Sequence, residues 1–186
     1  MLKSATPNEM RFMSSLKDEL LSRLNIMTLM PELKGRGLYM FCMRDPRGLA
    51  GIKPGHHGTI YVGATEKSLV IQKRFLQVHS GRAALRRSLG ALLREDLKLQ
   101  PLAKGLQSSK SEKFRFTNDG EARLTEWMNN NLWAAQLEVK VLLSRKEIDL
   151  IRELQPPLNL TKWFNPQKAF ICERRKVCAD MALGRF

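Results

Sequence analysis

The sequence contains few cysteines and no long apolar run. Only three of its 186 residues are cysteine (Cys42, Cys172 and Cys178), and an odd number of cysteines does not form a disulfide framework. Cys172 and Cys178 also lack the Cys-x-x-Cys spacing that is typical of zinc sites. No uncharged apolar segment approaches about 18 residues, which excludes a transmembrane helix, and the first residues do not resemble a secretory signal. We therefore expect a cytoplasmic protein with free thiols.

Acidic residues are scarce compared with basic ones. The chain has 32 Lys and Arg but only 18 Asp and Glu, which gives a formal net charge of +14. A hydrophobic content of 43% is too high for a disordered basic tail, so this charge belongs to a folded chain. A chain of this length suits one large domain and can bury roughly 70% of its unfolded surface. The positive charge would attract a polyanion, and DNA, RNA and an anionic membrane surface all remain open at this point.

Hydrophobic periodicity predicts the elements of the first third of the chain. The segment Thr6–Glu9 forms a helix start signal, and the apolar stripe over 10–27 predicts a helix that ends shortly before Pro31. Two short runs over 37–43 and 59–63 are rich in aromatic and β-branched residues, which favours strands. Turn-forming residues separate these runs, so a hairpin with a long loop is the simplest topology.

The rest of the chain alternates between helical and strand periods. One helix, over 82–98, places several leucines on one face and Arg87, Arg94 and Lys98 on the other, which we expect to be free to bind. Segment 82–115 carries a net charge of +6, and residues 104–110 within it are expected to form a mobile loop. The other expected elements are a helix over 67–78, a strand over 114–116, a helix after 117–120, a strand over 136–142, a helix over 145–154 and a last helix from 165.

A set of five residues in a fixed order carries the strongest functional signal. Gly37-Leu38-Tyr39 stands in the first expected strand, Tyr61-Val62-Gly63 in the second and Arg74 in the following helix, while Glu147 stands twelve residues before Asn159. This order resembles the GIY-YIG nuclease superfamily, with Leu38 and Val62 where the family usually has Ile. The resemblance covers roughly residues 35–160 and extends to bacterial GIY-YIG endonuclease-like proteins.

The resemblance implies a fold class and a division of the chain. The expected fold is α/β (α+β), with a small antiparallel three-stranded sheet flanked by helices, a basic helical insertion and helical extensions at both ends. Residues 1–34 would form the N-terminal helical extension and residues 35–161 the nuclease domain, with its basic insertion at about 82–132. Residues 162–186 would form a C-terminal basic helix.

The resemblance also implies a metal-dependent DNA endonuclease that hydrolyses phosphodiester bonds. Glu147 would bind Mg²⁺, with Mn²⁺ as the alternative ion, because a hard cation prefers oxygen ligands and keeps waters for the substrate. One of Tyr39 and Tyr61 would activate the attacking water, and Arg74 would bind the phosphate. Asn159 would orient the site. The expected catalytic residues are Tyr39, Tyr61, Arg74, His79, Glu147 and Asn159, with Gly37 and Gly63 as the motif glycines.

One position departs from the family pattern. The family usually has a His or Tyr four residues after the arginine, whereas this chain has Val78 there and His79 one residue later. Five residues along an ideal helix separate two side chains by about 140°, so His79 would reach the site only if the helix ends or bulges before it.

Basic residues outside this motif are the expected contacts to a DNA backbone. They lie in the 82–98 helix and in the C-terminal segment, and they are Arg82, Arg86, Arg87, Arg94, Lys98, Lys162, Arg174 and Arg175. DNA is therefore the expected partner, and a membrane is not. No separate DNA-recognition domain stands out, so specificity would come from the insertion, the termini or formation of a homodimer.

Two other functions remain open at the level of sequence. Val78 is also consistent with a GIY-YIG-like module that has lost catalysis and only binds nucleic acid, and the net charge is consistent with a ribosome-associated basic protein. Taken singly, the two tyrosines are typical strand core residues, and Trp163 beside Lys162 fits either a packing anchor or a contact to nucleic acid. Only the joint occurrence of the motif residues favours a nuclease.

Overall fold

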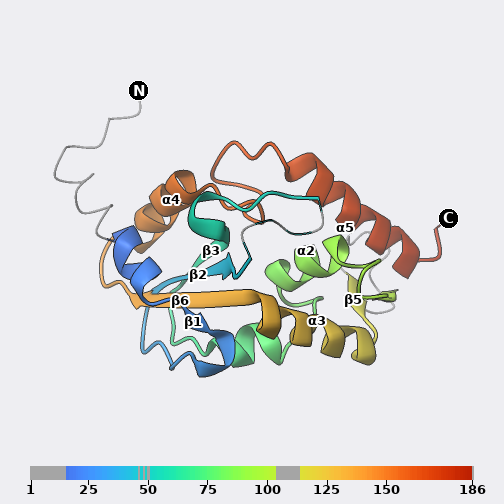
Figure 1. Ribbon diagram of the computed structural model, residues 1–186, viewed down its shortest axis with the longest axis horizontal. Helices are drawn as coiled ribbons and strands as arrows, with labels where there is room; N and C mark the ends of the chain where they lie inside the picture. The colour runs from blue at the N-terminus through green and yellow to red at the C-terminus, as the bar shows by residue number, and fades with distance from the viewer. Residues whose placement is uncertain (1–15, 46, 48, 50, 104–113, 186) are drawn as a thin grey trace.

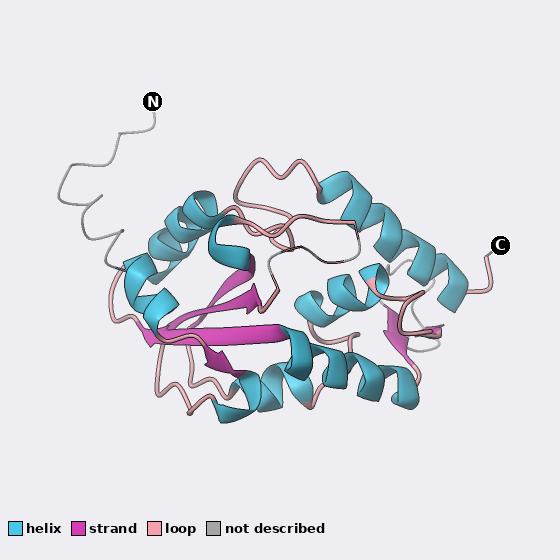
Figure 2. Cartoon of the chain, in the orientation of Figure 1, coloured by secondary structure: helices cyan, strands magenta, loops and turns pink. Residues whose placement is uncertain are grey.

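The computed structural model describes residues 16–45, 47, 49, 51–103 and 114–185 (Figure 1). Its centre is an antiparallel sheet with the strand order β1-β6-β2-β3, and helices lie around this sheet (Figure 2). The α+β class is therefore confirmed, and a two-residue strand, β1, is added to the three strands expected. The strands of this sheet are β1 (Asn25–Ile26), β2 (Gly37–Met43), β3 (Thr59–Thr65) and β6 (Leu132–Glu138).

Strand β2 is buried along its whole length because both faces of the sheet are covered. Tyr39 and Phe41 point into one hydrophobic cluster, while Leu38, Met40 and Cys42 point into the other. This alternation is the period of two that a strand imposes on its side chains. Since the two faces carry different side chains, the aromatic face can build a site while the aliphatic face packs.

The aliphatic face of the sheet is covered by α4 (Leu143–Leu154) and by the helical residues 16–22. In α4 the buried residues Leu150, Ile151 and Leu154 recur at the spacing of an amphipathic helix. Figure 1 shows these two helices at the end of the sheet opposite to α2 and α5. The packing fixes α4 against β3, the strand that carries Tyr61.

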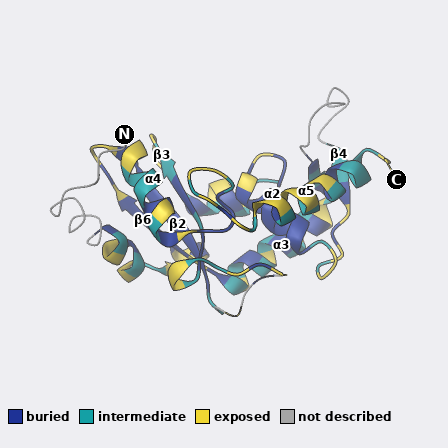
Figure 3. Cartoon of the chain, turned by 90° about the horizontal axis from the view of Figure 1, so that it is seen from above, coloured by how far each residue is buried: buried dark blue, intermediate teal, exposed yellow. Residues whose placement is uncertain are grey.

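The other part of the core lies beyond the opposite end of the sheet. It contains α2 (Ala84–Leu92), α3 (Asn118–Asn131) and α5 (Lys168–Ala182), with a small hairpin of β4 (Pro101–Ala103) and β5 (Phe114–Phe116). Helix α2 packs against α5 and is buried over nearly its whole length, as the dark blue ribbon in Figure 3 shows. The hydroxyl of Thr117 accepts a hydrogen bond from the Gly120 N–H at 3.2 Å, so the expected start signal of α3 is confirmed.

Two expected helices are shorter in the structure because strand pairing interrupts them. The N-terminal helix ends at residue 22 and not near Pro31, since β1 pairs with β6 directly afterwards. The helix expected over 67–78 is reduced to a π-helical segment, η3 (Gln72–Leu76), because Leu69 and Leu33 exchange two backbone hydrogen bonds of 2.8 and 2.9 Å. These hydrogen bonds hold the chain extended up to residue 70.

Other boundaries move by a few residues. Helix α2 ends at Leu92, and the carbonyls of Leu97 and Lys98 accept hydrogen bonds from Arg123 instead of continuing the helix. Strand β6 begins directly where α3 ends, four residues before the expected start. The remaining segments are η1 (Met27–Leu29) and η2 (His56–Gly58). The expected start signal over 6–9 and the expected loop over 104–110 lie outside the described residues.

Within the described ranges, no helix has the combination of length and apolar content that a membrane span needs.

Candidate active site

Tyr39 and Tyr61 lie side by side on the aromatic face of the sheet. Their strands pair antiparallel, with Tyr39 opposite Gly63 and Phe41 opposite Tyr61. This register makes the two tyrosines diagonal neighbours on one face, within reach for aromatic side chains. Their ring centroids are 6.3 Å apart and the rings are stacked. The structure therefore brings the two phenols together, as the sequence led us to expect.

The two motif glycines provide space that a side chain would fill. A Cβ atom at Gly63 would lie 2.5 Å from Cζ and from the hydroxyl oxygen of Tyr39. A Cβ atom at Gly37 would collide with the carbonyl oxygen of Leu137 in β6. Gly63 thus lets the ring of Tyr39 lie across β3, while Gly37 lets β2 approach β6 closely.

Arg74 reaches the same face from the π-helical segment η3. Its neighbour Phe75 is buried, with its ring centroid 5.4 Å from that of Tyr39 and 4.9 Å from that of Phe41. Phe75 therefore anchors the segment in the aromatic cluster and leaves the Arg74 side chain exposed at its edge. A π-helical turn is often found at functional sites, where it changes the direction of a side chain.

These residues line a cavity of about 590 Å³. The lining includes both tyrosines, Arg74 and two further cationic side chains, Lys73 and Arg82. No acidic side chain is among the lining residues. The cavity therefore combines two phenols with three positive charges, which suits a phosphate group.

Glu147 lies in α4 with its side chain only 14% exposed. Besides burial, the negative charge of its carboxylate raises the pKa of both tyrosines. Burial raises the pKa of Tyr39, and the positive charge of Arg74 opposes this rise. Burial raises the pKa of Tyr61 still further, with added contributions from Tyr39 and Glu147. Both phenols are therefore protonated at neutral pH and can donate hydrogen bonds.

The carboxylate of Glu147 accepts a hydrogen bond from the Lys162 ammonium at 2.6 Å. A partly buried carboxylate that faces a cation is suited to a divalent metal ion as well, because Mg²⁺ needs few protein oxygens and keeps its waters. Among the described residues, no three His, Cys, Asp or Glu side chains cluster into a larger ligand set. The donors thus fit a hard ion held by one carboxylate, and do not fit a structural zinc ion.

Asn159 is buried and supports the strand that carries Tyr61. Its side-chain oxygen accepts from the Val62 N–H and its amide donates to the Val62 carbonyl, both at 2.8 Å. These bonds satisfy the outer edge of β3, the last strand of the sheet. Asn159 therefore fixes the position of β3, whereas its amide does not point at the cavity.

The structure does not bring His79 to the cavity. His79 was expected to reach the site only if the helix ends before it, and η3 does end at Leu76. Val78 nevertheless lines the cavity, whereas His79 is not among the lining residues. Val78 offers no group that can transfer a proton. The departure from the family pattern is thus present in the geometry as well as in the sequence.

Two of the basic residues expected to bind DNA are buried instead. Arg86 is fully buried, where it pairs with Glu121 at 2.8 Å and donates to the Phe75 carbonyl at 2.8 Å. Arg87 is 8% exposed, and burial lowers its pKa, with a further contribution from nearby Arg175. The expectation for Arg86 and Arg87 is wrong because α3 and α5 cover the face of α2 that an isolated helix would expose.

The other expected DNA contacts lie on the surface or at its edge. Arg82 lines the cavity and Lys98 is exposed. Glu95 pairs with Arg94 at 2.7 Å and with Arg174 at 3.8 Å, which partly neutralises this region, while Arg175 is half-buried.

Lys73 was not identified from the sequence as a site residue, and neither were three residues that line a second cavity, near the C-terminal end of α4. Lys73 lines the first cavity beside Arg74, and the run Gln72-Lys73-Arg74 was the available signal. Arg152 and Phe164 line the second cavity, together with Gln155. The adjacent rings of Trp163 and Phe164 after Lys162 were the signal for that cavity.

Comparison with known proteins gives a family match. Residues 37–176 match the model of the family described as GIY-YIG catalytic domain. No curated protein and no solved structure matches the chain. The matched segment begins at Gly37, includes both tyrosines, Arg74, Glu147 and Asn159, and ends within α5.

Proposed function

Because the chain belongs to the GIY-YIG catalytic-domain family, whose members are nuclease-type phosphodiesterases that generally use a divalent metal, we propose that it is a metal-dependent DNA endonuclease. The observation that carries this proposal is the convergence of Tyr39, Tyr61 and Arg74 on one cationic cavity. Besides burial, the charge of Glu147 raises the pKa of both tyrosines. Arg82 at this cavity and other basic residues at the surface, such as Lys98, would contact the DNA backbone. We retain residues 35–161 as the proposed nuclease unit.

Glu147 would hold the divalent ion, Mg²⁺ or Mn²⁺. When bound, such an ion acts as a Lewis acid on a phosphate oxygen and stabilises the charge of a leaving oxygen. Lys162 now pairs with the same carboxylate, so Lys162 and the ion would compete for Glu147. Displaced from Glu147, the Lys162 ammonium would be available to a phosphate of the substrate.

Arg74, Lys73 and Arg82 would bind the scissile phosphate and its neighbours. Tyr39 is the better candidate to take the proton of the attacking water, because the rise that burial causes in the pKa of Tyr39 is opposed by both the charge of Arg74 and a hydrogen bond with Arg74, whereas the rise in the pKa of Tyr61 is opposed only by the charge of Arg74. In the free protein the raised pKa keeps Tyr39 protonated, so it must lose its own proton before it can accept one. Tyr61 would orient the water through its hydroxyl group.

The test is cleavage of supercoiled plasmid by purified Glu147→Ala. We expect cleavage to fall by about 100-fold or more, the scale on which removal of a single transition-state contact acts, whereas DNA affinity should change little. Glu126→Ala is the matched control, because Glu126 is an exposed glutamate on α3 away from the cavity. Equal Mg²⁺-dependent cleavage by Glu147→Ala and the parent protein would refute the proposal.

A second candidate function is a nucleic-acid-binding module without catalysis. The observation that favours it is Val78, which lines the cavity at the position where the resemblance led us to expect His or Tyr. Under this alternative the parent protein would bind DNA but would not nick plasmid in Mg²⁺ or Mn²⁺. Metal-dependent nicking that EDTA stops, and that Glu147→Ala lacks, would exclude it.

A further inference from the structure

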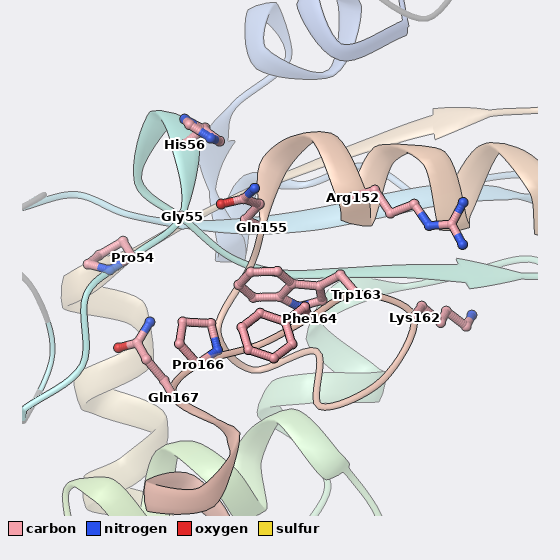
Figure 4. Close-up of a pocket in the computed structure, with 10 residues that line it drawn as sticks. All are labelled: Pro54, Gly55, His56, Arg152, Gln155, Lys162, Trp163, Phe164, Pro166 and Gln167. Atoms are coloured by element: carbon pink, nitrogen blue, oxygen red, sulfur yellow. The ribbon is translucent and has the colours of Figure 1, made fainter. Parts of the chain in front are cut away.

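A second cavity, of about 760 Å³, lies beyond the C-terminal end of α4 (Figure 4). Its walls come from the loop before β3, from the end of α4 and from the segment that leads into α5. Two aromatic rings, Trp163 and Phe164, occupy its centre, and two cationic side chains, Arg152 and Lys162, extend on one side of them (Figure 4). None of these residues except Lys162 has a part in the site described above.

Phe164 is an unusually exposed aromatic residue. Its side chain is 90% exposed, compared with 66% for Leu142, the next most exposed large hydrophobic residue among those described. The backbone on either side of it is nevertheless fixed. The Trp163 indole N–H donates to the Asn159 carbonyl at 2.9 Å, and the Asn165 amide donates to the Pro157 carbonyl at 2.7 Å. An exposed ring carried by a fixed backbone adds nothing to the core and is suited to stacking against a ligand.

The backbone around the cavity adopts costly conformations. Gln155 and Lys162, which both line it, have positive φ angles of 51° and 77°. Such conformations cost free energy for a residue with a side chain, and they cluster at functional sites. Gly55 also packs so tightly on the Leu154 carbonyl that a Cβ atom would collide with it. The fold therefore maintains the shape of this cavity at a cost in stability.

The charge of the cavity is positive. No ion pair to Arg152 is found among the described residues, and no acidic side chain lines the cavity. A neighbouring phosphate would therefore meet Arg152 without competition from a carboxylate, and its other cationic partner would be Lys162. The combination of an exposed ring and cationic groups is typical of a surface that binds single-stranded nucleic acid.

The second cavity is linked to the candidate active site by an ion pair and by hydrogen bonds, although the two cavities share no lining residue. Lys162 lines the cavity and pairs with Glu147, while Asn159, which accepts from Trp163, holds β3 next to Tyr61. One segment, over 155–165, thus joins the two sites. A phosphate that Lys162 binds would therefore lie next to Glu147, the carboxylate proposed to hold the metal ion.

We propose that this cavity binds one unpaired nucleotide of the cleaved DNA strand, with its base stacked on Phe164 and its phosphate paired with Arg152 and Lys162. This inference rests on the proposed nuclease function and assigns its substrate class. A base within an intact duplex is already stacked on its neighbours and is not available to Phe164. The preferred substrate is therefore DNA with an unpaired nucleotide beside the cleaved bond, as in a bulge, a gap or a flap.

The experiment measures binding separately from cleavage. Every variant is made in the Glu147→Ala background, and the probe is a short fluorescein-labelled oligothymidylate followed by anisotropy. Phe164→Ala should weaken binding by about 5- to 150-fold, the effect of removing one base–aromatic stacking contact. Phe164→Trp should restore affinity, whereas Phe164→Leu, which keeps an apolar side chain without a π-face, should not.

A matched control is Leu29→Ala in η1, since Leu29 is 64% exposed but lies outside both cavities. Its affinity should equal that of the Glu147→Ala background. Arg152→Ala should weaken binding and lower the salt dependence, with a slope in log K against log salt that is shallower by about 0.7 for a single strand. If the slope for Arg152→Ala is unchanged, Arg152 does not contact the phosphate, and that part of the proposal is overturned.

Failure of this inference can be told apart from failure of the proposed function. Equal oligothymidylate affinity of Phe164→Ala and the background overturns the inference, whatever the parent protein cleaves. If Phe164→Ala changes the oligomeric state of the protein in solution but leaves its affinity for oligothymidylate unchanged, the inference is also overturned and Phe164 belongs to a protein interface. If the parent lacks nuclease activity but Phe164→Ala still weakens binding and Phe164→Trp restores it, the nucleotide site stands and the endonuclease assignment fails.

Discussion

At the scale of single residues, the site depends on a glycine, Gly63, because the ring of Tyr39 occupies the space that a side chain would need. The Tyr39 ring lies where a Cβ atom at position 63 would be, only 2.5 Å from its hydroxyl oxygen. We expect Gly63→Ala to displace Tyr39 and to reduce the free energy of unfolding by about 1–3 kcal/mol, the usual cost of overpacking a core. Cleavage should fall as well, because the phenol would move relative to Arg74. Urea unfolding and plasmid nicking measure the two effects.

Ala64→Ser is the control for Gly63→Ala. It also adds one heavy atom in β3, but Ala64 packs on the opposite, aliphatic face of the sheet. It should therefore leave plasmid nicking near the parent level. If Gly63→Ala is as stable and as active as Ala64→Ser, the space around Tyr39 is not the reason for the glycine.

At the scale of elements, the segment over 155–165 forms hydrogen bonds with the outer edge of β3, as an additional strand would. Besides the two bonds between Asn159 and Val62, the Leu158 N–H donates to the Ile60 carbonyl at 3.0 Å. Asn159→Ala would leave the N–H and carbonyl of Val62 without partners in a buried position. We expect a loss of about 2–6 kcal/mol in the free energy of unfolding, given about 1–3 kcal/mol for each of the two unsatisfied groups.

Chemical unfolding of Asn159→Ala, with plasmid nicking of the folded variant, measures this effect. The matched control is Asn130→Ala, because Asn130 is exposed on α3. Asn159→Asp keeps an acceptor for the Val62 N–H but has no donor for its carbonyl, so it should also be destabilised. Stability of Asn159→Ala equal to that of Asn130→Ala would mean that the edge of β3 is held by other contacts.

Elements with a strong local signal could be predicted from the sequence, whereas those decided by long-range contacts could not. The strands β2 and β3 and the Thr117 cap of α3 depend on neighbouring residues, and all three are confirmed. The segment before η3 has a helical pattern, but its pairing with Leu33, more than thirty residues away, prevents a helix. Pairing partners that distant leave no trace in local periodicity.

The same distinction explains the basic residues. Arg86 occupies a polar position of an amphipathic pattern, and a single helix would expose it. Its partner Glu121 lies in α3, and only the tertiary fold brings the two together. The motif residues Tyr39, Tyr61 and Arg74 were found because their order along the chain resembles a family motif, which does not depend on their burial. The second cavity was missed because its residues come from loops without a periodic pattern.

At the scale of the whole molecule, folding buries two of the three thiols. Cys42 in β2 is 1% exposed and Cys178 in α5 is 0% exposed, whereas Cys172 is exposed. Burial raises the pKa of Cys42 from 9.0 to about 11 and that of Cys178 likewise to about 11. In the unfolded chain both thiols would titrate at the unshifted value of 9.0. The two states therefore bind different numbers of protons in alkaline solution.

This difference predicts how stability depends on pH. Between about pH 9 and pH 11 the unfolded chain loses the two thiol protons while the folded protein keeps them, so the free energy of unfolding must fall as pH rises. Two pKa units correspond to about 2–3 kcal/mol for each buried thiol. Urea unfolding across this pH range should show a shallower decline for the double variant Cys42→Ala with Cys178→Ala than for the parent, whatever its stability at neutral pH. Cys172→Ala should decline like the parent, and equal declines for all three proteins would mean that the two buried thiols do not control the alkaline limit of the fold.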